Sequence, residues 1–322
     1  MVLCNVMEKN PNSIIQHLVI SGGGIHGLIF YGILKEMNAQ NSWKIEDIKT
    51  IYGTSVGTII AIILCLMKTQ NNENDENDKK YNWETINNYL IQRPWQDIIH
   101  FNLYSIFNII QKKGIFSNIF FIELFRPLFN GLDIEINITF QEFYKLYEIE
   151  LHFFSTEINS FSITDFSHKT HPNMPILDAL HCSCAIPFIF EPYLNDEKCY
   201  IDGGILLNNP LEYCLNQIKD DETVLCIYKI HHIEHKPICE TATFTEYLIG
   251  IFNRFIHRFI NDCPTISSKY EKQIILFSVD AEMFSLQNFI SFASSKEERT
   301  QFIQKGVDIV LDKVRGGIKI DL

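Results

Sequence analysis

The amino-acid sequence predicts an α/β fold with a mainly parallel central sheet. Short β-rich segments and apolar helical segments alternate near the N-terminus, in the order strand, glycine turn, helix, strand, turn, helix. The chain has 322 residues, of which 46% are hydrophobic and 20% are charged, so it can bury a sizeable core. We expect a single domain over residues 1–322.

The elements of the N-terminal block follow from residue type and spacing. His17–Ser21 is a β-rich run that ends in glycines, and Ile48–Gly53 is a second run of this kind. Leu28–Met37 has apolar residues at helical spacing. Val56–Met67 is almost entirely apolar, so this helix should be buried on most sides. The low-complexity stretch at 70–80 has no apolar residue and should form a solvated surface loop.

The rest of the chain is less regular. Residues 84–147 look mainly helical, and the phenylalanines within 116–129 fit either a helical core or an apolar lid or acyl-chain channel over a site. Thr245–Ile260 predicts an amphipathic helix with a basic polar face, for which core packing and membrane-surface docking are both open. Ser295–Val314 predicts a C-terminal helix. Strands are predicted at Leu151–Thr156, Cys199–Asp202, Val224–Tyr228 and Gln273–Phe277.

Composition excludes several classes of protein. There are 27 Lys and Arg against 39 Asp and Glu, a net charge of −12, which argues against a nucleic-acid partner. Nine cysteines without CxxC or HExxH spacing predict reduced thiols and no metal site. We expect no cofactor. No signal peptide is visible, and the apolar run Ile59–Met67 is too short to span a bilayer. We expect a cytoplasmic protein; the sequence does not indicate its oligomeric state.

The first motif that suggests a chemical function is Gly22-Gly23-Gly24-Ile25-His26-Gly27, which follows a predicted strand and begins a predicted helix. Its backbone amides can bind a phosphate or a developing oxyanion. The same glycines satisfy the GxGxxG pattern of dinucleotide-binding folds, which leaves that alternative open. The alternative requires an acidic residue at the end of the next strand, whereas Glu46 and Asp47 precede that strand.

Two further motifs each offer a reactive side chain. Gly53-Thr54-Ser55-Val56-Gly57 is a G-x-S-x-G at a predicted strand-to-helix junction, where a nucleophilic serine needs small neighbours on a sharp turn. The alternative is a structural N-cap serine. Asp202-Gly203-Gly204 follows a predicted strand, so its carboxylate can be presented at a cleft; a simple turn is the alternative.

Taken together, the three motifs resemble those of the patatin-like phospholipases, lipid acyl hydrolases that use a Ser–Asp dyad. The family's glycine-rich oxyanion motif corresponds to Gly22–Gly27, its G-x-S-x-G to Gly53–Gly57, and its Asp-Gly-Gly to Asp202–Gly204. Ser183–Pro187 looks like the family's Ser-x-Ala-x-Pro segment. Asn208–Pro210 follows the aspartate at the expected spacing.

The resemblance covers roughly residues 16–215, and 216–322 should complete the same domain. It implies a three-layer α/β/α fold and chemistry without calcium. It also implies that Ser55 attacks an ester carbonyl of a lipid and that Asp202 acts as the general base. The amides of Gly23 and Gly24, with a contribution from Gly22, are the candidate oxyanion donors. A phospholipid at a membrane surface is the expected substrate; neutral lipid hydrolysis and lipid binding without catalysis are the alternatives.

Two features qualify this interpretation. The family's oxyanion motif usually carries Arg or Lys where this chain has His26, so any contribution of that side chain should depend on pH. A Ser–His–acid triad is the competing arrangement. It would draw its histidine from His231, His232 or His235, which lie downstream of Asp202.

Overall fold

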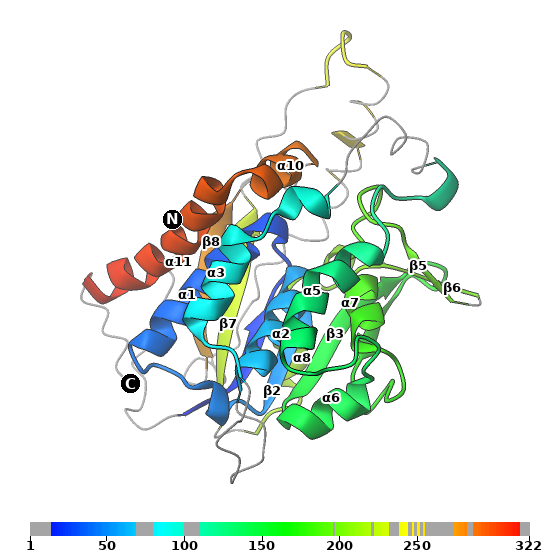
Figure 1. Cartoon of the computed structure of the whole chain (residues 1–322). Helices are drawn as coiled ribbons and strands as arrows, with labels where there is room; N and C mark the ends of the chain where they lie inside the picture. Colours follow the sequence, from blue (N-terminus) through cyan, green and yellow to red (C-terminus); the bar gives the residue numbers. More distant parts are fainter. Residues whose placement is uncertain are drawn as a thin grey trace.

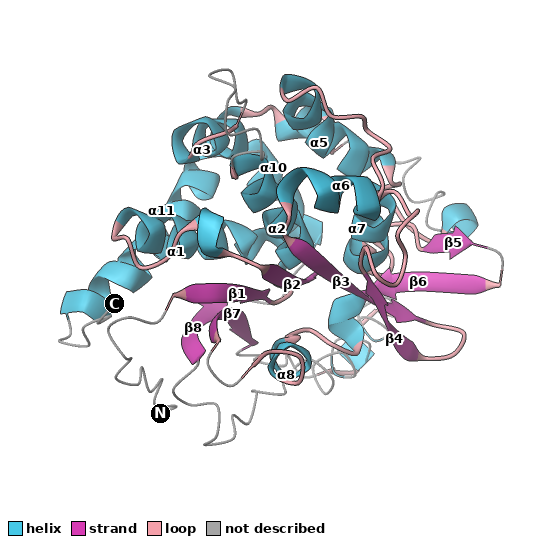
Figure 2. Cartoon of the chain, turned by 90° about the horizontal axis from the view of Figure 1, so that it is seen from below, coloured by secondary structure: helices cyan, strands magenta, loops and turns pink. Residues whose placement is uncertain are grey.

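A single sheet runs through the centre of the molecule (Figures 1 and 2). The computed structural model describes residues 14–68, 80–99, 110–195, 197–219, 222–231, 238–243, 247, 250–251, 254, 274–281 and 286–315. Within these residues the sheet has eight strands in the order β5-β6-β3-β2-β1-β7-β8, with β4 paired to β3. The parallel strands are β1 (Ile15–Ile20), β2 (Thr50–Thr54), β3 (Glu150–Glu157), β7 (Thr223–His231) and β8 (Ile274–Ala281).

Three shorter strands complete one side of the sheet in antiparallel orientation. They are β4 (Ser162–Phe166), β5 (Tyr193–Asn195) and β6 (Lys198–Asp202). The predicted α/β class with a mainly parallel sheet is confirmed, and β7 and β8 show that the C-terminal third contributes to the same sheet. The carboxyl ends of β1 and β2 lie side by side, since Ile20 pairs with Gly53.

Helices cover the sheet unequally. Val19 and Tyr52 face α8 (Leu211–Leu215), whereas their neighbours Leu18, Ile20 and Ile51 face a larger core on the opposite side. Figure 2 shows most helices on that side. They are α1 (Gly27–Ala39), α2 (Val56–Met67), α3 (Trp83–Gln92), α5 (Ile119–Gly131), α6 (Phe140–Tyr147), α7 (Ile176–Cys184), α10 (Leu286–Ser294) and α11 (Lys296–Arg315).

Two helices lie where their apolar residue pattern predicts them. The predicted helix Val56–Met67 has the bounds of α2, and the predicted C-terminal helix corresponds to α11. The amphipathic helix at 245–260 and the loop at 70–80 lie almost wholly outside the described residues. None of the helices in the described part of the chain is long and apolar enough to cross a membrane.

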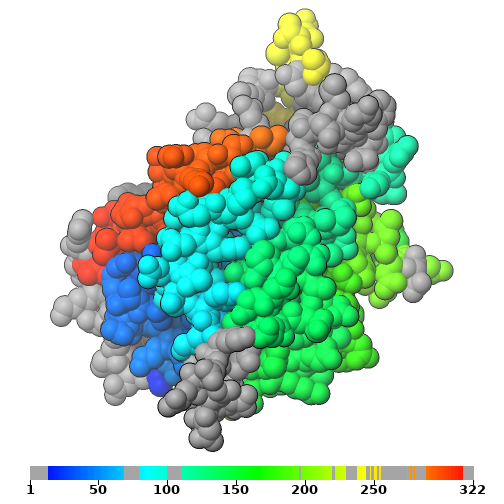
Figure 3. Space-filling view, viewed as in Figure 1, coloured from blue at the N-terminus to red at the C-terminus, as the bar shows by residue number. Residues whose placement is uncertain are grey.

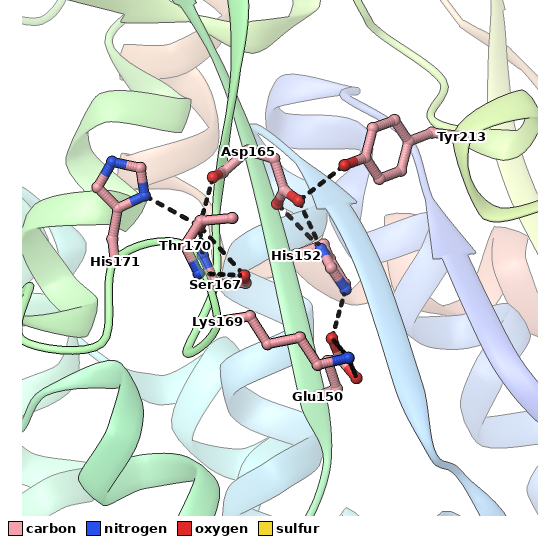
Figure 4. A network of polar contacts seen from close by, with 8 residues as sticks. All are labelled: Glu150, His152, Asp165, Ser167, Lys169, Thr170, His171 and Tyr213. Carbon is pink, nitrogen blue, oxygen red and sulfur yellow. Dashed lines mark hydrogen bonds and ion pairs between the residues drawn. The ribbon is translucent and has the colours of Figure 1, made fainter. Parts of the chain in front are cut away.

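A buried charge network fastens β4 and α8 to the sheet (Figure 4). The Nδ1 of His152 lies 2.8 Å from Asp165 and its Nε2 lies 3.0 Å from Glu150, while its ring stacks on Tyr52. The hydroxyl of Tyr213 donates to Asp165 at 3.0 Å. Burial opposes protonation of His152, but the two carboxylates outweigh it and raise the pKa of the imidazole. The two carboxylates therefore favour the cationic form of His152.

We predict that His152→Gln lowers the free energy of unfolding by about 2–4 kcal/mol at pH 6, because it leaves the buried Asp165 carboxylate without its cation and leaves Glu150 with Lys169 alone. The pKa of His152 is higher in the folded than in the unfolded state. Its contribution is therefore complete below about pH 6.5 and is lost as pH rises through the folded-state pKa. Urea unfolding at pH 6 and pH 9 should show the difference between the two proteins shrinking at pH 9. An equal difference at both values would mean that His152 acts as a neutral hydrogen-bonding group.

Candidate active site

Ser55 stands on a sharp turn between β2 and α2. Its φ of 53° and ψ of −124° place it in a strained region of backbone space, at a cost of about 1–3 kcal/mol. Only glycine fits at position 57, because a Cβ there would lie 2.1 Å from the carbonyl oxygen of Ile20. The turn places Ser55 at the N-terminus of α2, where the helix dipole favours negative charge.

Asp202 reaches Ser55 from the antiparallel part of the sheet. Strand β6 runs back along β3, with Asp202 opposite Ser155, and so delivers the carboxylate to the carboxyl edge of the sheet. The hydroxyl of Ser55 donates to Oδ2 of Asp202 at 2.6 Å, and the amide of Gly204 donates to Oδ1 at 2.7 Å. Burial outweighs these two hydrogen bonds and raises the pKa of Asp202 to about 6.

Ser183 of α7 supports the strained turn. Its Oγ accepts a hydrogen bond from the amide of Ser55 at 2.9 Å and donates one to the carbonyl of Phe154 at 2.6 Å. Ala185, directly after α7, holds Asp202 in a similar way, because its carbonyl accepts a hydrogen bond from the amide of Asp202 at 2.9 Å. Ser183 was noted in the sequence only as part of a motif; its role depends on contacts across 128 positions.

The glycine-rich loop after β1 lies against Ser55. A Cβ at Gly22 would come within 3.4 Å of the Cβ of Ser55, and Gly24, with a φ of 56°, lines the same cavity as Ser55. The amide of Gly22 donates to the carbonyl of Asn208 at 3.0 Å and thereby holds the loop. Within the described residues no hydrogen bond is found for the amides of Gly23 and Gly24. These two remain the candidate donors to an oxyanion.

The remaining glycines of the motifs allow close approach. A Cβ at Gly27 would lie 2.2 Å from Val56, a Cβ at Gly53 would lie 2.9 Å from the backbone of Gly57, and a Cβ at Gly203 would lie 2.1 Å from the carbonyl of Phe154. Gly27 thus packs the glycine loop against the Val56 side chain of the Ser55 motif, Gly53 tightens the Ser55 turn itself, and Gly203 brings the Asp202 motif against the backbone of β3. Any side chain at these positions would move the Ser55 turn, the glycine loop or the Asp202 strand relative to the others.

His26 is buried and helps to set the direction of the loop. Its Nδ1 lies 3.2 Å from the carbonyl of Gly23, which can only accept, so Nδ1 carries the proton. Burial, with a smaller effect of the Lys229 charge, lowers the pKa of His26 to about 4. The imidazole is therefore neutral above about pH 5. The pH dependence that the reference pKa led us to expect moves below the neutral range.

An apolar cavity of about 100 Å³ opens beside Ser55. Its walls come from α1, α2, α5, α10 and the loop after α7; they include Leu28, Ile60, Phe120, Phe121, Phe190 and Phe289. The aromatic segment 116–129 thus divides between two roles, because Phe125 and Phe129 lie in the core away from this lining. An apolar chain attached to a carbonyl at Ser55 would find matching surroundings here.

The residues required by the dinucleotide-binding and Ser–His–acid alternatives lie elsewhere or are only partly described. Glu46 and Asp47 lie in a 3₁₀ turn before β2, at the edge of the sheet opposite the glycine loop, so they are not placed to hold a ribose there. His231 ends β7, and His232 and His235 lie outside the described residues. The Ser55 hydroxyl donates to a carboxylate directly.

Comparison with known proteins identifies relatives across most of the chain. The family model described as patatin-like phospholipase matches residues 18–215. An uncharacterized protein of Acanthamoeba polyphaga mimivirus is 27% identical over 288 residues, 87% of this chain and 88% of the relative. A probable lipid hydrolase of Invertebrate iridescent virus 6 is 24% identical over 309 residues, 89% of this chain and 88% of the relative. Triacylglycerol lipase 5 of Saccharomyces cerevisiae is 24% identical over 271 residues, 80% of this chain but 32% of that protein.

Two solved structures are similar at lower identity. VipD from Legionella pneumophila has a TM-score of 0.47 and 14% identity, covering 98% of this chain and 72% of VipD. The type III effector ExoU has a TM-score of 0.39 and 11% identity, covering 93% of this chain and 54% of ExoU.

The raised pKa of Asp202 predicts how the reactivity of Ser55 changes with pH. Only the ionised carboxylate accepts the Ser55 proton, so the rate at which a fluorophosphonate labels Ser55 should fall about tenfold per unit below pH 6. The same inflection should appear in His26→Gln, since the pKa of His26 is about 4. An inflection near pH 4 that moves in this variant would assign the titration to His26 instead.

The same burial predicts that Asp202→Asn stabilises the fold at neutral pH. A carboxyl whose pKa rises from 3.8 to about 6 on folding contributes stability below pH 3.8 and loses it as pH rises through 6. Asparagine mimics the protonated form, so the free energy of unfolding at pH 7.5 should rise by about 1–3 kcal/mol. Asp165→Asn is the matched control and should be destabilising, since it weakens the contact with His152. Destabilisation by Asp202→Asn would contradict the assigned pKa.

Proposed function

The chain belongs to the patatin-like phospholipase family, and on that premise we propose that it hydrolyses carboxylic ester bonds of phospholipids through an acyl-enzyme on Ser55. The contact that carries the proposal is the 2.6 Å hydrogen bond to Asp202 from the hydroxyl of Ser55, which lines an apolar cavity. A nucleophile, a base and an apolar pocket thus meet at one point.

In the proposed reaction, Ser55 Oγ attacks the ester carbonyl carbon while its proton moves to Oδ2 of Asp202. The carbonyl oxygen becomes an oxyanion that the amides of Gly23 and Gly24 stabilise, and each such donor is worth about 10²–10³ in rate. Collapse breaks the ester bond, and the leaving alkoxide takes the proton from Asp202. Water then attacks the acyl-enzyme with Asp202 as base, which releases the fatty acid and restores Ser55.

The environment of Asp202 supports its role as base. An aspartate with a pKa near 3.9 is a weak base toward an alcohol, and burial moves the pKa to about 6, closer to neutral pH. The hydrogen bond from Gly204 to Oδ1 leaves Oδ2 directed at Ser55. Proton transfer therefore needs no rotation of the carboxylate.

A neutral acyl lipid is the second candidate substrate. His26 stands where the family usually has a permanently charged side chain, and its pKa of about 4 leaves it neutral. The loop therefore lacks one cation that would favour an anionic head group over an uncharged glyceride. Comparing phospholipid with triacylglycerol hydrolysis by the same preparation decides between the two.

The test is fatty-acid release from phospholipid vesicles in the presence of a chelator. Ser55→Ala and Asp202→Asn should each lower the rate by at least about 10³-fold, because each removes a group of the reacting pair. Ser167→Ala, at a buried serine that does not line the cavity, is the control and should retain the rate. Release that persists in Ser55→Ala would refute the mechanism; lipid binding by the folded wild type without hydrolysis would support the non-catalytic alternative.

A further inference from the structure

A completely buried serine lies at the start of the glycine loop. Ser21 follows the last residue of β1, and its Oγ serves both as acceptor and as donor. It accepts a hydrogen bond from the amide of Lys229 in β7 at 3.2 Å and donates one to the carbonyl oxygen of Gly22 at 3.1 Å. The backbone amide of Ser21 also donates to the carbonyl of Ile227 in β7 at 3.0 Å. Ser21 therefore ties the first peptide of the glycine loop to the sheet.

Asn208 holds the same glycine at two points. Its backbone carbonyl accepts from the Gly22 amide at 3.0 Å, and its side-chain Nδ2 donates to the Gly22 carbonyl at 3.5 Å, a long hydrogen bond. A Cβ at position 22 would lie 2.3 Å from Oδ1 of Asn208, so the side-chain amide packs directly against the glycine. Gly22 is thus held at its N–H by one partner and at its carbonyl by two.

Fixing the Gly22 carbonyl also fixes the amide of Gly23. The two groups belong to one planar trans peptide, in which the C=O and N–H bonds point in opposite directions. Ser21 and Asn208 hold the carbonyl, whereas the Gly23 amide has no hydrogen bond among the described residues and is a candidate donor to the oxyanion. The next peptide is held in the same way, since the Gly23 carbonyl accepts from the His26 amide at 3.2 Å and lies 3.2 Å from Nδ1 of His26. Both candidate donors therefore belong to peptides whose carbonyl is already held.

A second buried serine holds the Ser55 turn by the same arrangement. Ser183 accepts from the amide of Ser55 and donates to the carbonyl of Phe154 in β3, much as Ser21 accepts from β7 and donates to the glycine loop. Removing such a hydroxyl leaves a buried donor and a buried acceptor without their partner. The two serines thus hold the two turns whose relative position decides the reaction.

We propose that Ser21 and Asn208 are positioning residues that aim the Gly23 amide at the oxyanion before substrate binds. A donor that is already oriented stabilises the developing charge without a cost of reorganisation. Ser21 carries the larger share, because its hydrogen bond to Gly22 is the shorter of the two, 3.1 against 3.5 Å. The inference rests on the proposed function for the reaction that it assists, whereas the orientation of the amide is a property of the resting protein.

Ser21 cannot act through contact with a lipid surface. It is completely buried, and the face of the molecule in Figure 3 is formed by other segments, among them α3 in cyan, α5 in green and α10 and α11 in orange and red. Asn208 is half-buried. An effect of Ser21→Ala on the rate therefore arises inside the protein, and Ser21 is the residue on which the test depends.

The direction of the Gly23 amide is measured first, without substrate. The full chain is labelled with nitrogen-15 glycine, which gives signals from only 15 glycines, and residual dipolar couplings report the angle of each N–H bond. Ser21→Ala should change the coupling of Gly23 and leave those of Gly53 and Gly57 unchanged. Asn208→Ala keeps its backbone carbonyl and should change the Gly23 coupling by less. An unchanged Gly23 coupling in Ser21→Ala would overturn the proposal; if that variant does not fold, Asn208→Ala decides by the same criterion.

Kinetics then test whether this orientation matters for the reaction. With monomeric p-nitrophenyl butyrate, and with rates expressed per site labelled by a fluorophosphonate, Ser21→Ala should lower kcat about 10- to 100-fold. KM should stay within about twofold, because the oxyanion forms only on the way to the acyl-enzyme. Asn208→Ala should lower kcat by about 3- to 10-fold. A kcat of Ser21→Ala within about twofold of the wild-type value would overturn the proposal.

Ser167→Ala is the matched control. Ser167 is also completely buried and hydrogen-bonds Thr170 in the loop after β4, and it does not line the cavity. It should lose stability but keep both kcat and the Gly23 coupling. An equal loss of kcat in this control would overturn the proposal, since it would show a general effect of removing a buried hydroxyl. A wild type that hydrolyses no ester would refute the proposed function alone, because the Gly23 coupling is measured without turnover.

Discussion

The hydrogen bond between the Ser55 hydroxyl and the Asp202 carboxylate is the contact on which the other features of the site depend. The two residues lie 147 positions apart and arrive on strands of opposite direction, one from the parallel part of the sheet and one from the antiparallel part. Burial raises the pKa of the Asp202 carboxyl, and the tight turn brings the Ser55 hydroxyl within reach of it. The fold meets both needs at the carboxyl edge, where β1 and β2 end side by side and the short strand β6 returns along β3.

The backbone of Ser55 is strained, and hydrogen bonds from surrounding polar groups hold it in that conformation. Ser183 links the Ser55 amide to Phe154 of β3, and Asn208 links the glycine loop to the segment after Asp202. The glycines at 57 and 203 let helix, strand and loop approach to backbone contact. Each of the three motifs is therefore fixed by the other two. The His152 network holds the β3–β4 pair from the opposite face, so β3 is anchored on both sides.

The sequence allowed much of this to be predicted, and the limits have physical causes. Val56–Met67 was recognisable because an apolar run between a glycine turn and a polar loop has few alternatives to a buried helix. The short strands β4 and β5 were missed because they are partly exposed and have little periodic pattern. Ser55 and Asp202 carry recognisable local motifs, whereas the use of the Gly22 amide depends on Asn208, 186 positions away. The roles of Ser183 and His152 likewise depend on long-range contacts. The Ser-x-Ala-x-Pro segment drew attention to Ser183, whereas no motif includes His152.

The neutral side chain of His26 is consistent with the raised pKa of Asp202. A guanidinium or ammonium at this position would favour the ionised form of any carboxylate nearby and would lower its pKa. Among the described residues, the pKa of Asp202 is set by burial and by the hydrogen bonds from Ser55 and Gly204. A neutral imidazole can still donate from Nδ1 to Gly23, so the orientation of the loop does not need a charge. The side chain at position 26 therefore orients the Gly23–Gly24 peptide in this chain without itself supplying a cation.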